Sequence, residues 1–153
     1  MEKLSKAGFR LVGLRLEQKT SNKNNQSNLD CGNLWQKFEK ENIIDLIPNR
    51  LGNEIYAVYF DYEKDEAAPF SYFIGCRVDD NVETPKNLNS LKIPSQKYQK
   101  VTARGVMTGC IIDAWNKIWN ADIERKFGFD FEVYDERSEN WDDAVVDIYV
   151  SIA

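Results

Sequence analysis

The sequence predicts an α+β fold, in which two similar βαββ units pack together in a single domain with approximate two-fold symmetry. Three observations lead to this prediction. The chain has 153 residues, which suits one domain with its own hydrophobic core. The order strand, helix, strand, strand can be followed in residues 1–80 and again in residues 93–153. Residues 81–92 contain Pro85 and three Asn residues, and are expected to connect the two units.

The first unit is expected to contain one long helix between strands. Phe9–Leu16 is rich in branched apolar residues and predicts a strand. After the polar residues 18–28, apolar residues recur at helical spacing and predict a helix from about Asn33 to Leu46. Ile55–Tyr62 and Ser71–Val78 then predict the two strands of a hairpin, separated by a charged turn.

The second unit repeats this order. Tyr98–Val106 predicts its first strand, and an amphipathic pattern predicts a helix from about Thr108 to Lys126. Phe129–Tyr134 and Val145–Ile152 predict the closing hairpin. Two such units give an antiparallel sheet with two long helices, and a central ligand cleft is expected on the symmetry axis between the units.

The composition excludes several classes of function. The chain has no histidine, which rules out Ser-His-Asp and Cys-His catalysis and any histidine general base. Its formal net charge of −5 argues against general affinity for the phosphate backbone of nucleic acids. No motif for a metal ion, a phosphate or a cofactor is present, so neither a cofactor nor turnover of ordinary esters, amides or phosphates is expected.

The cysteines and the N-terminus predict a cytoplasmic protein. Cys31, Cys76 and Cys110 are far apart and odd in number, which is typical of reduced thiols and not of a disulfide framework or a zinc site. The first residues lack the apolar core of a signal peptide, and no apolar run is long enough to span a membrane.

Glu132 is the main candidate for a ligand-binding residue. It lies on an expected strand, where alternation places it on the same face as Asp130 and Tyr134. Two interpretations are open: this face is solvated, as for most strand carboxylates, or Glu132 lies at the bottom of an aromatic cleft. A carboxylate buried without a partner is costly, so the second interpretation implies a cationic ligand.

Aromatic residues are numerous enough to line such a cleft, since the chain has four Trp and seven Tyr. When Gly52 is matched to Gly128, Tyr56 falls opposite Glu132, and Tyr134 shares the face of Glu132. Tyr56 and Tyr134 are therefore expected to contact the ligand, where their rings would add cation–π attraction.

Tyr72, Trp115 and Trp119 complete the expected set of ligand-binding residues. Core packing between helix and sheet is the alternative for both tryptophans. Core packing is favoured for at least one of Trp115 and Trp119. Trp35 occupies the position in the first unit that Trp115 occupies in the second, which favours a core position over ligand contact. Trp141 stands in a charged turn, where it could act as a lid, form an oligomer contact or pack onto the sheet edge.

Several segments along the whole chain, in their order and spacing, together resemble the GyrI-like, or AraC-type, effector-binding domain. The resemblance is strongest to the stand-alone bacterial forms of this domain, including those carried on integron gene cassettes. The segments that carry the resemblance are Leu34–Phe38, Ile55–Tyr62, Ser71–Val78, Ile93–Tyr98, Ala114–Trp119, Asp130–Tyr134 and Val146–Ile152. The resemblance implies the duplicated βαββ fold and the sensing of bulky cationic amphiphiles for transcription control. It also implies that Glu132, in the Phe-Glu-x-Tyr pattern, lies in the pocket.

Three functions are compatible with these observations. The leading hypothesis is a non-enzymatic binding protein for bulky hydrophobic, cationic organic compounds, with no direct nucleic-acid binding. The second is a protein-interaction module of the gyrase-inhibitor type, which would need an exposed surface for a protein partner or a homodimer. The third is a hydrolase of strained electrophilic molecules, with Glu132 as base and Tyr56 or Tyr134 as its orienting partner.

Overall fold

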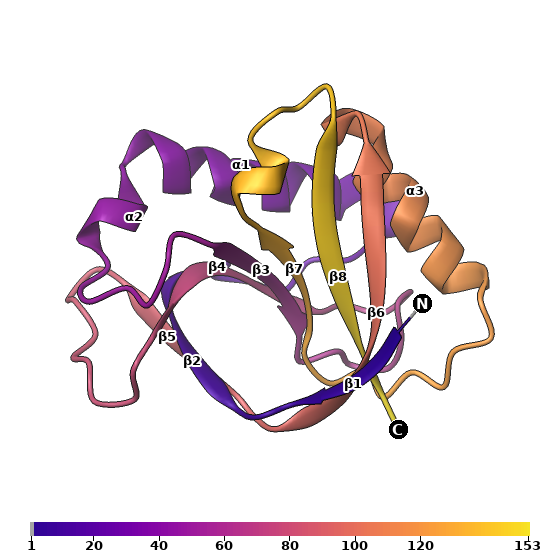
Figure 1. The fold of residues 1–153 in the computed structure, drawn as a ribbon, viewed down its shortest axis with the longest axis horizontal. Helices are drawn as coiled ribbons and strands as arrows, with labels where there is room; N and C mark the ends of the chain where they lie inside the picture. Colours follow the sequence, from indigo (N-terminus) through magenta and orange to yellow (C-terminus); the bar gives the residue numbers. More distant parts are fainter. Residues whose placement is uncertain (1) are drawn as a thin grey trace.

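The computed structural model describes residues 2–153 and confirms the α+β fold (Figure 1). Eight strands form one antiparallel sheet in the order β1-β6-β8-β7-β3-β4-β2-β5. The strands are β1 (Glu2–Lys6), β2 (Phe9–Arg15), β3 (Ile55–Phe60), β4 (Ser71–Val78), β5 (Asn89–Ile93), β6 (Gln96–Gly105), β7 (Asp130–Tyr134) and β8 (Ala144–Ile152). The α-helices are α1 (Gln26–Lys40), α2 (Ile43–Leu46) and α3 (Met107–Asn120), and Lys23–Asn25 and Glu136–Ser138 are short 3₁₀-helices.

The strand order is symmetric about the boundary between β3 and β7. On one side lie β3, β4, β2 and β5, and on the other lie β7, β8, β6 and β1. The two outermost strands are exchanged between the halves, because β1 precedes β2 in the chain but pairs with β6, whereas β5 precedes β6 but pairs with β2. Each half therefore depends on a strand from the other half to cover its edge.

The exchanged strands correct the prediction in two places. Glu2–Lys6 was not expected to form a strand, and Asn89–Ile93 begins within residues 81–92, which were expected to be a connector. Both strands are five residues long, and most of their residues are exposed or half-buried. Such short edge strands lack the run of apolar residues that makes a central strand recognisable in a sequence.

Both long helices differ from the predicted limits. The first begins at Gln26 instead of Asn33, and the left-handed backbone of Asn42 separates it from α2. Asp30 lies inside this helix, and its carboxylate accepts hydrogen bonds from the Thr20 hydroxyl (2.7 Å) and the Gln26 amide (2.9 Å).

The second long helix ends at Asn120 instead of Lys126, because the backbone at Ala121 becomes extended. The residues that follow run beside the end of β8. The Lys126 amide donates to the Ser151 carbonyl, the Ala153 amide donates to the Glu124 carbonyl, and Arg125 forms a bridge with Ile152. These contacts with a distant strand replace the last turns of the predicted helix.

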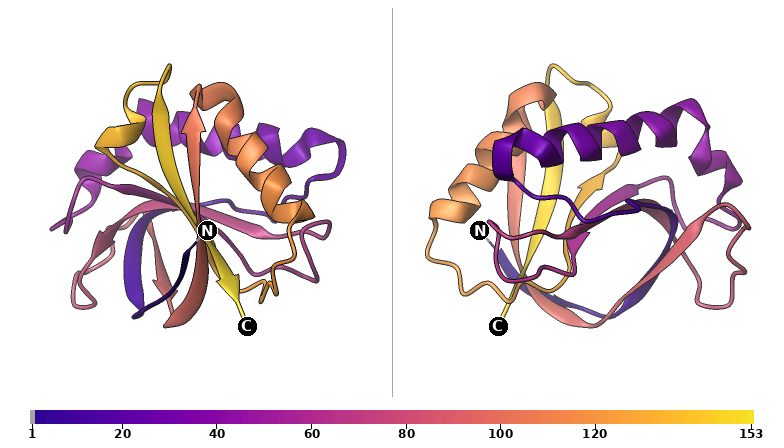
Figure 2. Two further views of the ribbon diagram at one scale, coloured as in Figure 1. Left: turned by 45° about the vertical axis from the view of Figure 1, so that its right-hand side comes forward. Right: turned by 180° about the vertical axis from the view of Figure 1, so that it is seen from behind.

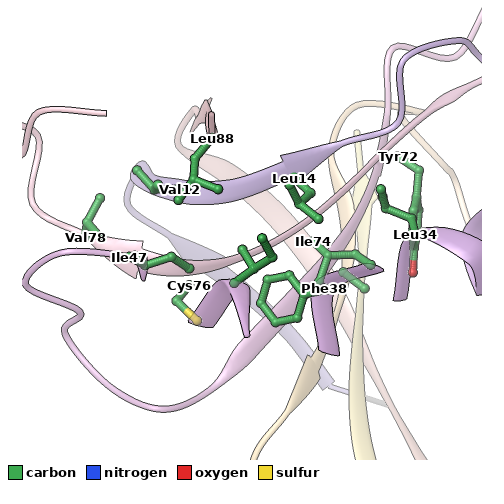
Figure 3. Close-up of a cluster of buried hydrophobic side chains, with 12 residues drawn as sticks. Val12, Leu14, Leu34, Phe38, Ile47, Tyr72, Ile74, Cys76, Val78 and Leu88 are labelled. Carbon is green, nitrogen blue, oxygen red and sulfur yellow. The ribbon is translucent and has the colours of Figure 1, made fainter. Parts of the chain in front are cut away.

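The helices α1 and α3 cover the same face of the sheet (Figures 1 and 2). The sheet is strongly curved, so its outer strands β2, β5 and β1 lie below the central strands, on the side away from the helices. The core under α1 contains side chains of α1, β2 and β4 that meet as shown in Figure 3, among them Leu14, Phe38 and Ile74. A second cluster lies under α3 and a third fills the opposite face. Within residues 2–153 no helix is both long and apolar enough to cross a membrane.

Candidate ligand-binding site

A cavity of about 940 Å³ lies on the helix-covered face, between α1 and α3 and over the boundary of β3 and β7. This is the symmetry axis of the sheet, where the sequence predicted the cleft. The volume is within the range of pockets that hold small organic molecules. Its lining is rich in aromatic side chains and includes Cys31, Trp35, Ile55, Tyr59, Tyr72, Met107, Ile111, Glu132, Tyr134 and Trp141.

Glu132 lies at the base of this cavity with only 1 % of its surface exposed. Its carboxylate accepts three hydrogen bonds from side chains. The hydroxyl of Tyr134 donates to Oε1 (2.6 Å), and the hydroxyl of Tyr59 (2.8 Å) and the indole nitrogen of Trp115 (2.7 Å) donate to Oε2. Strands β3 and β7 and helix α3 therefore position this group together.

The partners of Glu132 are all neutral. No lysine or arginine among residues 2–153 forms an ion pair with its carboxylate. Burial raises the pKa of Glu132 above its ordinary value of 4.5, and the hydrogen bonds from Tyr134, Trp115 and Tyr59 lower it only in part. Removal from water disfavours the charged form of a carboxyl group, and nearby dipoles compensate incompletely.

Aromatic rings surround the carboxylate. The Tyr59 ring lies 5.2 Å from the Trp115 ring and 5.0 Å from the Tyr72 ring, measured between centroids. Trp35 lies 5.1 Å from Tyr134 and donates its indole N–H to the Tyr72 hydroxyl (2.8 Å). This network holds the rings in defined positions, so the cavity offers several aromatic faces next to one carboxylate.

A smaller cavity of about 360 Å³ adjoins the first one. The two share Asn28, Cys31, Tyr59 and Ile111 as lining residues. Burial, together with the negative charges of Glu132 and Asp30, raises the pKa of the shared Cys31 thiol to about 12, so Cys31 is a neutral wall residue at physiological pH. The smaller cavity is also lined by Tyr62, Glu66, Phe70, Ile112, Trp115, Trp119 and Arg125.

A family model of integron-associated effector binding proteins, named Cass2, matches residues 5–152. The chain belongs to the Cass2 family. The property by which this family is described is the binding of an effector molecule, not catalysis.

Relatives of this Cass2 chain agree with the assignment. It is similar to YobU of Bacillus subtilis (strain 168), described as a "putative transcriptional regulator protein", with 27 % identity over 78 % of this chain and 77 % of YobU. It resembles an integron cassette protein from the mobile metagenome of Vibrio cholerae, with 25 % identity, a TM-score of 0.74, and coverage of 99 % and 95 % of the two chains. It shares the fold of SAV2435 bound to tetraphenylphosphonium, with 20 % identity, a TM-score of 0.78, and coverage of 99 % and 93 %.

The structure of the Cass2 chain brings most of the predicted site residues together. Tyr134 and Trp115 donate hydrogen bonds to Glu132, and Tyr72 lines the same cavity. Trp119 is placed differently, since it lines the smaller cavity beside Trp115 and is 40 % exposed. Their roles in binding a ligand stay predictions.

The expected position of Tyr56 is wrong. In the pairing of β3 with β7, Glu132 is opposite Ala57, and Tyr56 is opposite Val133. Because side chains alternate along a strand, Tyr56 points to the other face of the sheet, where its ring packs on Phe9 and Phe131. Matching glycines between the two units gave a register that was shifted by one residue.

Tyr59 and Trp35 are the site residues that the prediction missed. Tyr59 lies two positions after Ala57 and therefore on the same face as Glu132, but this follows only once the pairing of β3 and β7 is known. Trp35 was expected to be a core residue, yet it lines the larger cavity and orients Tyr72. Trp141 also lines that cavity and is 60 % exposed, which places it at the rim.

Proposed function

We propose that this chain binds a bulky hydrophobic organic cation in the larger cavity, with the Glu132 carboxylate as the counter-charge. The observation that carries the proposal is the environment of Glu132, which is buried at the base of an aromatic cavity with three neutral hydrogen-bond donors. A cationic ligand would supply the positive charge that residues 2–153 do not place beside this carboxylate.

The energetics favour a cation over a neutral ligand of the same size. The Glu132 carboxylate has already lost its water, so an incoming positive charge gains attraction without a second desolvation of the acid. The rings of Tyr59, Tyr134 and Trp35 add cation–π attraction on several sides. The binding of tetraphenylphosphonium by SAV2435, which has the same fold, supports this choice of ligand class.

The binding event has a regulatory counterpart in this proposal. YobU is described as a "putative transcriptional regulator protein", and we infer that ligand binding to this chain controls transcription through a regulator that serves as its partner. The net charge of −5 argues that the chain itself does not bind nucleic acid.

Isothermal titration calorimetry with tetraphenylphosphonium and tetraphenylborate tests the charge preference, because the two ions have the same shape and opposite charge. The wild-type protein is expected to bind the cation only. Glu132→Gln preserves the shape of the side chain and removes its charge, and it should weaken cation binding by about 1.5–3 kcal/mol.

Two results would contradict the proposal. Equal affinity for both ions in the wild-type protein would mean that shape and not charge selects the ligand. An unchanged affinity for tetraphenylphosphonium in Glu132→Gln would assign the carboxylate a purely structural role. Circular dichroism of the variant provides the control that the fold is intact.

A further inference from the structure

A second buried charged side chain lies in the smaller cavity and is not used by the proposed function. This is Arg125, which follows α3 and whose side chain is 7 % exposed. One guanidinium nitrogen, Nη2, donates to Asp130 Oδ2 at 2.8 Å. The other two nitrogens, Nε and Nη1, are buried and have no hydrogen-bond partner.

The guanidinium is held firmly in this position. Asp130 is fully buried and accepts hydrogen bonds from Tyr62, Arg125 and Ser151, so its bonds fix the Nη2 edge. The guanidinium carbon lies 4.3 Å from the centroid of the Phe127 ring. A guanidinium has five donors, and buried donors without acceptors are unfavourable.

Glu66 is the nearest acidic group on the free side of the guanidinium. Its carboxylate oxygen lies 3.8 Å from Arg125 Nη1, which is within ion-pair range but too long for a hydrogen bond. Glu66 lines the same cavity and its side chain is 40 % exposed. It precedes β4 in the loop after β3, and an incoming acceptor would compete with it for Nη1.

The two buried charges lie in adjoining cavities. Trp115 links them, because its indole N–H donates to Glu132 and its ring centroid lies 5.9 Å from the guanidinium carbon of Arg125. Tyr59, Cys31 and other residues line both cavities. A ligand that occupies both cavities would pass beside Tyr59 to reach Arg125.

We propose that Arg125 anchors a second subsite, which takes a carboxylate of the same ligand. The ligand class would then be an aromatic cation that carries a carboxylate at its other end. This inference rests on the proposed function, because it places the cationic end of the ligand at Glu132. The Nε and Nη1 donors would receive the acceptor that the free protein lacks.

The dyes rhodamine 110 and rhodamine 123 test this subsite, since they share one cationic ring system. Rhodamine 110 carries a free carboxylate, and rhodamine 123 carries the methyl ester of the same group. Fluorescence anisotropy titrations at neutral pH give the affinity of each dye. The wild-type protein is expected to bind rhodamine 110 about fivefold more tightly or better, as for one charge-assisted contact.

Two variants assign the preference to this pair of residues. Glu66→Gln removes the competing carboxylate from an exposed position, and should raise the preference for rhodamine 110 by about threefold or more. Arg125→Lys keeps a positive charge beside Asp130 but removes the planar fork, and should reduce the preference to within about twofold. The ratio between the dyes cancels any general effect on binding of the cationic rings.

The outcomes separate this inference from the proposed function. Equal affinity for the two dyes in the wild-type protein, or an unchanged ratio in Glu66→Gln, overturns the subsite while Glu132-dependent binding of tetraphenylphosphonium is unaffected. Failure of both dyes and of tetraphenylphosphonium to bind overturns both proposals. If Arg125→Lys does not fold, the result for Glu66→Gln decides.

Discussion

Strand β7 buries two carboxylates, two residues apart, and gives them opposite surroundings. Asp130 is 0 % exposed and pairs with the guanidinium of Arg125 at 2.8 Å, while the hydroxyl and amide of Ser151 donate to its other oxygen. Glu132 is 1 % exposed and has only neutral donors. Burial alone therefore does not distinguish the two carboxylates, whereas the charge of the partner does.

The difference has an energetic consequence. In the Asp130 pair, each charge offsets the desolvation of the other, so the pair joins residue 125 to the central sheet. At Glu132 the charge is only partly offset, and its raised pKa reflects this. The first site stabilises the fold without a ligand, whereas the second is the one that we propose a cationic ligand completes.

Removing each charge in turn should give the largest contrast. Asp130→Asn leaves Arg125 buried without its counter-charge and should lower the free energy of unfolding by about 3–5 kcal/mol. Glu132→Gln removes a charge that has no ionic partner but replaces one of its two acceptor oxygens with an NH2 group, and should lower the same quantity by about 1–2 kcal/mol. Urea denaturation at neutral pH measures both, and similar losses in the two variants would show that Glu132 is also structural.

The pH dependence of cation binding should follow Glu132. Protonation neutralises the counter-charge, so the affinity for tetraphenylphosphonium is expected to fall by about tenfold per pH unit below the pKa of Glu132. Because burial raises this pKa, the loss should begin above pH 4.5. Calorimetry across a pH series should show a flat profile for Glu132→Gln, and a matching slope in that variant would assign the effect to another group.

The stability of the ligand-free protein should depend on the same pKa, but it should fall with rising pH, whereas the affinity for the cation rises. The native state binds the proton on Glu132 more tightly than the unfolded chain does. Its contribution to the free energy of unfolding is therefore present at low pH and is lost as pH rises from about 4.5 through the raised pKa. The difference between wild type and Glu132→Gln across pH isolates this contribution, and no pH dependence in that difference would argue against a raised pKa.

The smallest expected effect tests the strand register, with two tyrosines of β3 as matched variants. Tyr59→Phe removes one donor to the Glu132 carboxylate and should shift the midpoint of the binding profile upward by about one pH unit. Tyr56→Phe lies on the other face and should leave the midpoint unchanged. A shift in Tyr56→Phe and none in Tyr59→Phe would mean that the register is wrong.

The sequence was informative wherever the local pattern is strong. The predicted limits of the central strands lie within two residues of the observed ones. Alternating or continuous apolar residues mark a strand that is buried on at least one face. The edge strands Glu2–Lys6 and Asn89–Ile93 were missed, since their stability comes from pairing with the opposite half. The end of α3 was placed too late for the same reason, because residues 121–126 bond to a distant strand.

For the site, the main elements of the chemistry could be predicted from the residues and their spacing. The absence of histidine excluded common catalytic machinery, and the alternation around Glu132 placed this carboxylate and Tyr134 on one face of a strand. The resemblance to effector-binding domains rested on segments spread over the whole chain, and the Cass2 match covers residues 5–152.

The covered face of the sheet and the tyrosine that reaches the carboxylate could not be predicted, because both depend on how distant strands pair. Pairing of β3 with β7 joins residues more than 70 positions apart, and a shift of one residue exchanges Tyr59 for Tyr56 at the site. The charge of each carboxylate's partner was likewise undetermined by the sequence, because Arg125 reaches Asp130 only after the chain leaves α3 early. Long-range pairing and its register set these features, and local patterns of residues do not encode them.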